Sequence, residues 1–301
     1  MTTSVPSAPA VSRVRTYASF VRFEHTLFSL PLILAGVFSV PGPAMAPMRW
    51  LWVTIAAVGA RTAGMSLNRL IDRRIDALNP RTKVRELPAG KMKTPEAVAL
   101  LVGSGAAYLA ACAILGPWFL KVAIVPLAVF TLYPYLKRFT PFCHFGVGTA
   151  LALAPLAGYA AAHPGLEHPQ TAFWLAGFAL AWVTGFDIIY ATLDEEFDRS
   201  HGVHSMVAWL GRRPALQVSW LLHLVAAGAL AQVALGAMQH APQHMPWAFA
   251  AIALYCGALL LLWLEQRWAE DVNLAFFQIN VWVGVMVLAI VLAARMAAGG
   301  F

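Results

Sequence analysis

The chain has 301 residues, of which 60% are hydrophobic and only 12% are charged, whereas ordinary soluble domains carry about 25% charged residues. A soluble core could not bury that much apolar surface, so the composition excludes a soluble globular protein and favours a polytopic membrane protein. The net charge of +7 does not indicate a nucleic-acid partner, because the sequence offers no folded basic domain that would present such a surface.

Nine apolar segments follow one another along the chain, each long enough to cross about 30 Å of hydrocarbon as a helix. They lie near residues 24–42, 50–68, 95–115, 118–136, 144–162, 171–192, 215–237, 246–264 and 276–297. None alternates as the strands of a barrel do, so the sequence predicts an all-α membrane protein with a bundle of nine transmembrane helices. We expect residues 1–15 to be a disordered tail, because the first ten are small and proline-containing, and residues 16–301 to form one domain.

Basic residues gather on one side of these segments. Most of the 21 lysines and arginines lie in the N-terminal arm and in the loops after the even-numbered segments, while Arg49, Lys121 and Arg295 lie at the opposite ends. By the positive-inside rule, the N-terminus and the basic loops face the cytoplasm. We therefore expect a multi-pass protein of a bacterial-type cytoplasmic (inner) membrane.

Two sets of acidic residues lie at the cytoplasmic ends of expected helices. Asn68, Asp72 and Asp76 are spaced i, i+4, i+8, so a helix presents all three on one face. The second set follows the sixth segment, where Asp194 and Asp198 are again four residues apart. The two sets therefore point to one functional site on the cytoplasmic side.

The two sets need a cationic partner, because like charges four residues apart destabilise a helix and carboxylates near a membrane interface are costly to desolvate. Oxygen ligands in this number suit Mg²⁺, which commonly shares its coordination shell with substrate phosphates. The sequence thus indicates a diphosphate held by metal, with Asp187, two turns before the second set, as a ligand or a supporting residue. The alternative is that these acids are solvated helix ends that form salt bridges with nearby arginines; the presence of two matched sets favours the metal.

Basic residues close to the acidic sets are candidates for binding the diphosphate, because guanidinium and ammonium groups suit phosphate oxygens. They are Arg81, Lys83, Arg85, Lys91, Lys137 and Arg138. For most of them the alternative is the positive-inside signal itself. Arg61 differs because it lies inside an expected span, where an arginine is a functional candidate by default. Arg22, at the start of the first span, either binds substrate or extends its side chain to the interface.

These residues resemble the UbiA-type intramembrane prenyltransferases over nearly the whole chain. The family motif N-D-x-x-D-x-x-x-D corresponds to Asn68, Asp72 and Asp76, with Arg69 in place of the first aspartate. The other matching elements are R-x-x-G at Arg61 and Gly64, R-T-x-x-R-P-L-x-x-G at residues 81–90 with Glu86 in place of proline, Y-P-x-x-K-R-x-T at Tyr133 to Thr140, and Y-A-x-x-D-x-x-x-D-x-x-x-G-x-x-S at Tyr190 to Ser205.

The resemblance implies a bundle with a central cavity, capped on the cytoplasmic side by the two motif-bearing loops. It implies an enzyme that moves a prenyl chain from a polyprenyl diphosphate to an acceptor, often aromatic, with Mg²⁺ as cofactor. Asn68, Asp72 and Asp76 would hold one Mg²⁺ and Asp194 and Asp198 a second, the four aspartates being the catalytic set. The substrate-binding candidates are Arg22, Arg61, Arg81, Arg85, Tyr133, Lys137, Arg138, His144, Asp187 and Tyr190.

One element departs from the pattern of typical 4-hydroxybenzoate enzymes of this family. There Y-P-x-x-K-R continues T-x-x-P-Q, whereas residues 140–144 here read TPFCH, as in a subgroup of which some members serve the futalosine route to menaquinone. We expect the acceptor to be 4-hydroxybenzoate or a related quinone precursor, with a futalosine-derived menaquinone precursor as the alternative. His144 either contacts that acceptor or is an ordinary histidine at a helix end.

Two other protein classes use intramembrane or interfacial acids. An ion-coupled transporter would place its site near the membrane midplane in broken helices, whereas these acids cluster at one face beside basic loops. Phosphatidyl-transferring enzymes that use CDP-alcohols carry their aspartates in one array, D-G-x-x-A-R followed by G-x-x-x-D-x-x-x-D, which this sequence lacks.

Overall fold

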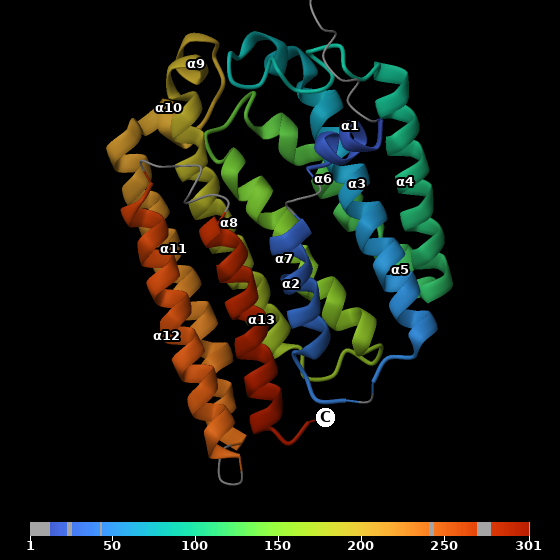
Figure 1. Ribbon diagram of the computed structural model, residues 1–301, viewed down its shortest axis with the longest axis vertical. Coiled ribbons are helices and arrows are strands. Elements are labelled where there is room, and N and C mark those ends of the chain that lie inside the picture. Colours follow the sequence, from blue (N-terminus) through green and yellow to red (C-terminus); the bar gives the residue numbers. More distant parts are fainter. Residues whose placement is uncertain (1–12, 23–25, 43, 241–243, 270–277, 301) are drawn as a thin grey trace, which may run out of the picture.

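The structure, a computed structural model, describes residues 13–22, 26–42, 44–240, 244–269 and 278–300 (Figure 1). Its regular elements are all helices, and the described residues contain no β-strand, which confirms the expected all-α class. Of the expected N-terminal tail, residues 1–12 lie outside the described residues, and Arg13 begins a short helix.

The helices lie as follows along the chain: α1 (Arg13–Phe20), α2 (Thr26–Phe38), α3 (Pro47–Leu78), α4 (Thr94–Leu115), α5 (Pro117–Val122), α6 (Ile124–Leu136), α7 (Cys143–Ala162), α8 (Gln170–Ala191), the 3₁₀ turn η2 (Thr192–Asp194), α9 (Glu195–Ser200), α10 (Met206–Leu210), α11 (Arg212–Gly236), the 3₁₀ turn η3 (Ala237–His240), α12 (Met245–Arg267) and α13 (Asn280–Ala297).

Seven helical stretches within the described residues are long and apolar enough to cross a membrane. They are Thr94–Leu115, Pro117–Leu136, Cys143–Ala162, Gln170–Ser200, Arg212–Gln239, Met245–Arg267 and Asn280–Ala297. The two remaining expected spans fall on α2, which has 13 residues, and on α3, whose 32 residues include Arg61 in their apolar half. The structure thus confirms a bundle with several candidate spans, and the count of nine stays a prediction.

The fourth expected span is broken at Ala123 into α5 and α6. Pro126 explains the break, because it has no N–H to donate to the carbonyl of Val122 and its ring disfavours a continuous helix. Both pieces belong to one stretch long enough to span, so the break does not end the span.

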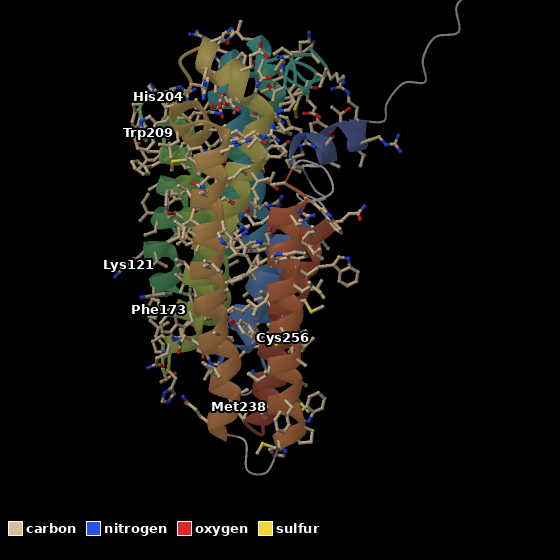
Figure 2. The ribbon with its side chains drawn as sticks, turned by 90° about the vertical axis from the view of Figure 1, so that its left-hand side faces the viewer. Lys121, Phe173, His204, Trp209, Met238 and Cys256 are labelled. Carbon is tan, nitrogen blue, oxygen red and sulfur yellow. The ribbon has the colours of Figure 1, made fainter. Side chains whose placement is uncertain are left out.

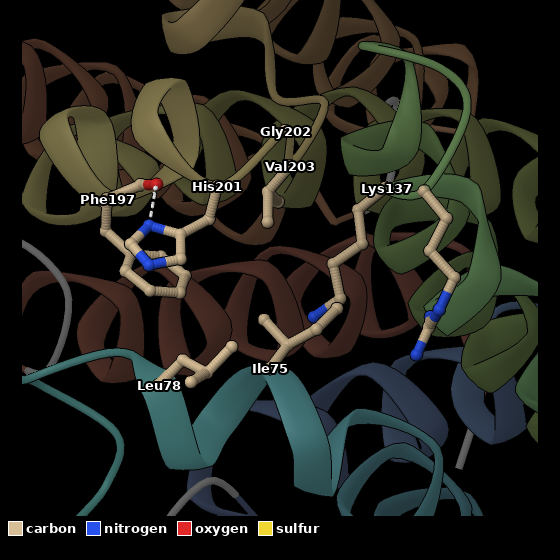
Figure 3. Close-up of a pocket in the computed structure, with 8 residues that line it drawn as sticks. Ile75, Leu78, Lys137, Phe197, His201, Gly202 and Val203 are labelled. Carbon is tan, nitrogen blue, oxygen red and sulfur yellow. Dashed lines mark hydrogen bonds between the residues drawn. The ribbon is translucent and has the colours of Figure 1, made fainter.

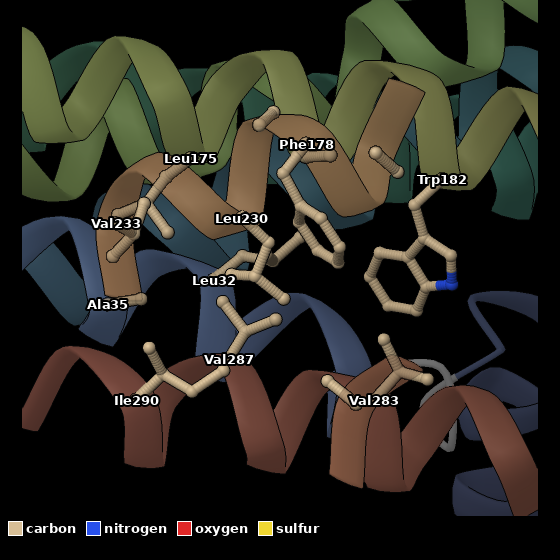
Figure 4. Packing of buried hydrophobic residues seen from close by; sticks show 14 of the residues in the cluster. Leu32, Ala35, Leu175, Phe178, Trp182, Leu230, Val233, Val283, Val287 and Ile290 are labelled. Atoms are coloured by element: carbon tan, nitrogen blue, oxygen red, sulfur yellow. The ribbon is translucent and has the colours of Figure 1, made fainter. Parts of the chain in front are cut away.

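The bundle has two parts. Six helices form a closed ring in which each packs on the next, in the order α2, α7, α8, α11, α12 and α13. Helices α3 and α4 lie side by side (Figure 1) and join the ring through α6, which packs on both α3 and α7. The main apolar core fills the ring, where Phe178, Trp182 and Leu230 pack against Val283 and Val287 (Figure 4).

Glycines allow α2 and α7 to cross with their backbones in contact. A Cβ atom on Gly158 would lie 2.0 Å from the carbonyl oxygen of Ile33, and one on Gly36 would lie 2.0 Å from that of Pro155. Membrane helices commonly cross at small residues, which let their backbones approach closely. Close packing matters there because helix association within lipid gains no hydrophobic free energy. The crossing fixes α7, which carries part of the site described below.

Large apolar side chains lie on the outside of the bundle as well as in its core. Phe173, Trp209 and Met238 are examples at different heights of the bundle (Figure 2), and the Phe173 side chain is 62% exposed. Exposed apolar surface on this scale marks a surface that meets a membrane or a partner. Loops, by contrast, gather at the end of the bundle where α9, α10 and α1 lie (Figure 1).

Candidate active site

A pocket of about 210 Å³ opens at this loop-rich end, between the ends of α3 and α6, the start of α7, the end of α8, and α9. It collects both acidic sets and most of the basic and aromatic candidates, although these come from positions as far apart as 68 and 198. The predicted residues that line it are Asn68, Asp72, Asp76, Arg81, Arg85, Tyr133, Lys137, His144, Asp187, Tyr190, Asp194 and Asp198.

Asp72 is the most deeply buried acid of the first set, with 1% of the residue exposed. The Lys137 ammonium lies 2.6 Å from its Oδ2 and the Asn68 amide donates to the same oxygen at 3.2 Å. Arg138 lies 3.4 Å from Oδ1, but no hydrogen bond reaches that oxygen from the described residues. Burial raises the pKa of Asp72, while the Lys137 ammonium opposes the rise. The carboxylate therefore has one oxygen satisfied and one available.

Asp76 is held by the loop that follows α3. One Arg85 nitrogen donates to both carboxylate oxygens, at 2.8 and 2.9 Å, and the Thr82 hydroxyl donates to the Asp76 carbonyl at 3.0 Å. The loop thus folds back over the end of the helix that carries the first acidic set.

The same loop reaches the second acidic set. Arg81 donates to both oxygens of Asp194, with Nε 2.8 Å from Oδ1, and its NH1 donates to the Tyr190 hydroxyl at 2.7 Å. Its guanidinium also lies over the Tyr190 ring, 4.8 Å from the centre. Burial lowers the pKa of Arg81, but the hydrogen bond to Asp194 and the nearby charges outweigh that effect and the pKa is raised. Arg81 therefore ties the loop after α3 to the second set, as Arg85 in the same loop does to Asp76 of the first.

Asn79 strengthens this connection and was not a candidate from the sequence. Its side-chain amide donates to Asp194 Oδ1 at 2.8 Å, and its Oδ1 accepts from the Arg81 backbone N–H at 2.8 Å. The local signal is an asparagine that ends α3 immediately before Pro80, a common way to stop a helix. The sequence could place that turn but not its partner 115 residues away.

The second set does not lie on one continuous α-helix. Helix α8 ends at Ala191, and the 3₁₀ turn η2 changes the winding before Asp198 in α9. Ser205 caps α10 by accepting the Ala208 N–H at 3.1 Å, and the neighbouring His204 N–H donates to the Lys137 carbonyl at 2.7 Å. The loop after the second set is thereby tied to the end of α6.

A neighbouring pocket of about 220 Å³ shares Lys137 with the first (Figure 3). Arg138 and His201 line it, and the His201 ring stacks on Phe197 at 4.2 Å. Gly202, with a backbone φ of +65°, makes the turn beside it. The residues that line this second pocket include no carboxylate.

His144 and Asp187 form a pair on the pocket wall where α7 meets α8. His144 Nδ1 lies 2.7 Å from Asp187 Oδ2, and the Met206 backbone N–H donates to His144 Nε2 at 3.2 Å. The ring is thus held at both nitrogens, and Asp187 faces the pocket.

Three arginines of interest do not line the main pocket. Arg61 donates to the Arg22 carbonyl at 3.0 Å and so joins α3 to the end of α1. Arg138 donates to the carbonyls of Pro134 and Ile71 and joins α6 to α3. A substrate role for these three stays a prediction.

Arg69, which replaces the first aspartate of the family motif, is buried and donates to the Phe20 carbonyl at 3.4 Å. Burial lowers its pKa to about 10. It does not line the pocket, so this departure leaves the acidic face of α3 unchanged.

Comparison with known proteins shows where this arrangement belongs. Residues 29–284 match the profile of the UbiA prenyltransferase family. The 4-hydroxybenzoate octaprenyltransferase of Vibrio campbellii is 26% identical over 284 residues, which cover 93% of this chain and 97% of that protein. The apo structure of a UbiA homolog from Aeropyrum pernix K1 is 31% identical, with a TM-score of 0.77 over 89% of this chain and 97% of that one.

A second solved structure, a UbiA homolog from Archaeoglobus fulgidus bound to GPP and Mg²⁺, is 18% identical and shares the fold, with a TM-score of 0.69 over 94% of this chain and 99% of that one. All residues that line the two pockets lie within the matched range. With seven apolar helices of spanning length among its described residues, the protein is an integral multi-pass membrane protein. The profile spans most of its length, and the chain therefore belongs to the UbiA prenyltransferase family.

Proposed function

We propose that this prenyltransferase joins a polyprenyl chain, taken from a polyprenyl diphosphate, to the ring of 4-hydroxybenzoate or a related quinone precursor, with Mg²⁺ as cofactor. The observation that carries the proposal is the pocket in which both acidic sets meet Arg81, Arg85 and Lys137. Relatives named 4-hydroxybenzoate octaprenyltransferase, which align with nearly the whole chain, support the acceptor and the long donor chain.

The side chains fit a hard divalent cation. Asn68, Asp72, Asp76, Asp194 and Asp198 bring oxygen ligands to one pocket, and one oxygen of Asp72 accepts no hydrogen bond. Such oxygens are the ligands that Mg²⁺ prefers, and these five residues would hold it. When bound, Mg²⁺ neutralises negative charge on the leaving diphosphate. No group of three metal-type side chains is already assembled among the described residues, because the acids are turned toward basic partners.

Those basic partners would bind the diphosphate. Arg81, Arg85 and Lys137 would exchange an aspartate for phosphate oxygens and stabilise the charge that grows as the allylic C–O bond breaks. Tyr133 and Tyr190 line the same pocket, and aromatic faces of this kind stabilise a nearby cation. The acceptor ring would then attack the allylic carbon.

We further propose that the pocket faces the cytoplasm of a bacterial-type inner membrane. The support is the charge pattern: the loop between α3 and α4 and the N-terminal arm hold most of the excess positive charge, and such loops stay on the cytoplasmic side. The loops that carry the two acidic sets would cap the cavity on that side.

A menaquinone precursor of the futalosine route is the second candidate acceptor. The observation that favours it is His144, which stands where typical 4-hydroxybenzoate enzymes continue with Pro-Gln and which lies on the pocket wall. A different side chain at this wall is the kind of change that alters acceptor choice.

The test uses purified protein in detergent, geranyl diphosphate and 4-hydroxybenzoate, with Mg²⁺ or with EDTA. We expect Mg²⁺-dependent prenyl-hydroxybenzoate, and a loss of about 100-fold or more in Asp72→Ala and Asp194→Ala, since single charge-stabilising groups commonly contribute that much. Glu196→Ala is the matched control, because Glu196 is exposed on α9 outside the pocket and should leave the rate unchanged.

Other outcomes would redirect the assignment. Diphosphate release without prenyl-hydroxybenzoate keeps the reaction class and moves the acceptor toward a menaquinone precursor. Folded protein that turns over no diphosphate with any acceptor would contradict the proposed reaction and favour an ion-coupled transporter.

A further inference from the structure

The reaction proposed above leaves a highly charged product in the main pocket. When the allylic C–O bond breaks, the diphosphate keeps the electron pair of that bond. Such an anion cannot leave through hydrocarbon, where even one charge is costly, so it must reach water at the loop-rich end. The lining of the main pocket holds five aspartates against three lysines and arginines, a surplus of negative charge that opposes retention of the anion.

One side of the main pocket is crossed by ion pairs. The loop after α3 is tied to both acidic sets through Arg81 and Arg85, so a path on that side requires these pairs to break. On the other side, residues 75–78 of α3 and 197–203 lie across the second pocket from each other (Figure 3). No hydrogen bond or salt bridge joins these two segments within the part of the chain that the structure describes. Parting them therefore costs no ion pair.

The two pockets have a common wall. Both are lined by Ile75, Lys137, Phe197 and Val203. Lys137 is the charged member of this wall, and its ammonium lies 2.6 Å from Asp72 Oδ2. Because Lys137 borders both spaces, it can hold a phosphate oxygen in the main pocket, pass it to the second pocket and return to Asp72.

Positive charge continues into the second pocket. Arg138 lines this pocket but not the main one, and its guanidinium is fixed by the carbonyls of Pro134 and Ile71, at 2.7 and 2.9 Å. Arg138 and Lys137 share Asp72 as their carboxylate partner, so two cations there face one anion. A diphosphate would supply the missing negative charge, for which a guanidinium is a suitable partner.

His201 brings a ring nitrogen without a partner to the same pocket. Its Nδ1 lies 3.2 Å from the Phe197 carbonyl oxygen and 2.9 Å from the Ser200 hydroxyl. Since a carbonyl can only accept, Nδ1 carries a hydrogen, and Nε2 has no hydrogen-bond partner among the described residues. The ring stacks on Phe197, which fixes its plane. Histidine takes up a proton near neutral pH, and the protonated ring offers Nε2–H to an anion.

We propose that the second pocket is the exit site for inorganic diphosphate. The anion released in the main pocket passes Lys137, is bound by Arg138 and His201, and reaches water between α3 and α9. The prenylated product needs no such route, because its chain can stay in the lipid. The assignment rests on the proposed function, since the diphosphate is the leaving group of that reaction.

Product inhibition tests the binding site. Inorganic diphosphate in the exit site should inhibit noncompetitively toward geranyl diphosphate, which binds in the main pocket. His201→Phe keeps an aromatic ring to stack on Phe197 but has no ring nitrogen. We expect the noncompetitive inhibition constant to rise about tenfold in this variant, as for the loss of one hydrogen bond to a charged group, with KM for geranyl diphosphate unchanged. Purely competitive inhibition of the wild type, or a parallel change in KM, would overturn the assignment.

Blocking the pocket tests the route. His201→Trp fills the space and removes the nitrogen that binds the anion. In a rapid-quench assay with Mg²⁺, we expect a burst of about one product per enzyme at the wild-type rate, followed by turnover slowed about tenfold or more, because diphosphate release then limits kcat. Wild-type turnover without a burst, or a first turnover as slow as the later ones, would contradict the route.

Two further variants separate the route from damage to the fold. Leu78→Trp narrows the pocket from the opposite wall and should give the same burst; Leu78 is 63% exposed and does not line the main pocket. Glu196→Trp places the same side chain on α9 outside both pockets and should leave turnover unchanged. A burst in Glu196→Trp, or none in either pocket variant, would refute the exit site.

These outcomes distinguish the two proposals. A folded wild-type enzyme that releases no diphosphate from geranyl diphosphate defeats the proposed function and this inference together. A wild-type enzyme that turns over, and whose inhibition by inorganic diphosphate is the same in His201→Phe, defeats only the exit site.

Discussion

At the scale of single residues, the pocket is an array of buried ion pairs. The sequence allowed two interpretations of the acidic sets: a metal site, or solvated helix ends that form salt bridges. The acids do form salt bridges with nearby basic residues, but Asp72 and Asp76 are buried rather than solvated. Buried pairs cost desolvation free energy that a structural role alone does not require. Their arrangement is what a site that must exchange counter-ions needs.

Removing one member of such a pair should destabilise the protein. Lys137→Met leaves Asp72 buried without its ammonium partner, and breaking a buried pair costs about 3–5 kcal/mol. We therefore expect a lower unfolding temperature in detergent with EDTA. Adding Asp72→Asn should restore most of the loss.

Lys83→Met, which removes the same charge from an exposed loop position, should change stability by no more than about 0.5 kcal/mol. A double variant Lys137→Met/Asp72→Asn no more stable than Lys137→Met would contradict the pairing.

Cation and diphosphate should bind better together than separately. Mg²⁺ alone would have to leave Arg81, Arg85 or Lys137 without a carboxylate, and diphosphate alone would leave the aspartates without a cation. We expect the rise in unfolding temperature with Mg²⁺ plus inorganic diphosphate to exceed the sum of the two separate rises. Additive shifts would argue against an exchange of ion pairs.

At the scale of elements, helix crossings position the site. The crossing of α2 and α7 depends on Gly158, where a Cβ atom would lie 2.0 Å from a backbone oxygen. Gly158→Ala should therefore destabilise the protein by about 1–3 kcal/mol, as overpacking does, measured as loss of folded, monodisperse protein on heating.

Gly228→Ala on α11 is the control, since nothing lies within 4 Å of an added Cβ atom there. Alanine is a better helix former than glycine by about 0.8–1.0 kcal/mol, so stability should stay equal or rise. A stable Gly158→Ala variant would show that α2 and α7 can separate at no cost.

Helix positions could be predicted from the sequence, and contacts between loops could not. The expected segments 95–115 and 144–162 agree with α4 and α7 to within one residue at each end, because long apolar runs leave a membrane chain few other choices. The i, i+4 spacing likewise predicted that Asp72 and Asp76 share one helix face, and both line the same pocket. The contacts of Asn79 with Asp194 and of Arg81 with Tyr190 depend on how distant loops fold together, which no local pattern encodes.

At the scale of the whole molecule, the positions of the loops distinguish the two ends of the bundle. The acidic sets, the pocket and the loop after α3 lie at one end of the bundle, and the turn between α7 and α8 lies at the other (Figure 1). From the charge pattern we predict that the pocket end faces the cytoplasm.

Cysteine labelling tests that orientation. In a background in which Cys143 and Cys256 are replaced by serine, Lys83→Cys should react with a membrane-impermeant maleimide only from the cytoplasmic side, and Glu167→Cys only from the other. Both positions are exposed, and the remaining Cys112 is buried. The reverse pattern would place the pocket outside the cytoplasm.

The two-part bundle has a consequence for how ligand and fold depend on each other. The first acidic set belongs to α3, outside the six-helix ring, and the second follows α8, within it. A ligand that bridges the sets would act as a crosslink between two bodies that meet mainly through α6. Ligand at 100 times its Kd adds about 2.7 kcal/mol of stability, so the donor substrate would serve the enzyme as a structural component for as long as it stays bound.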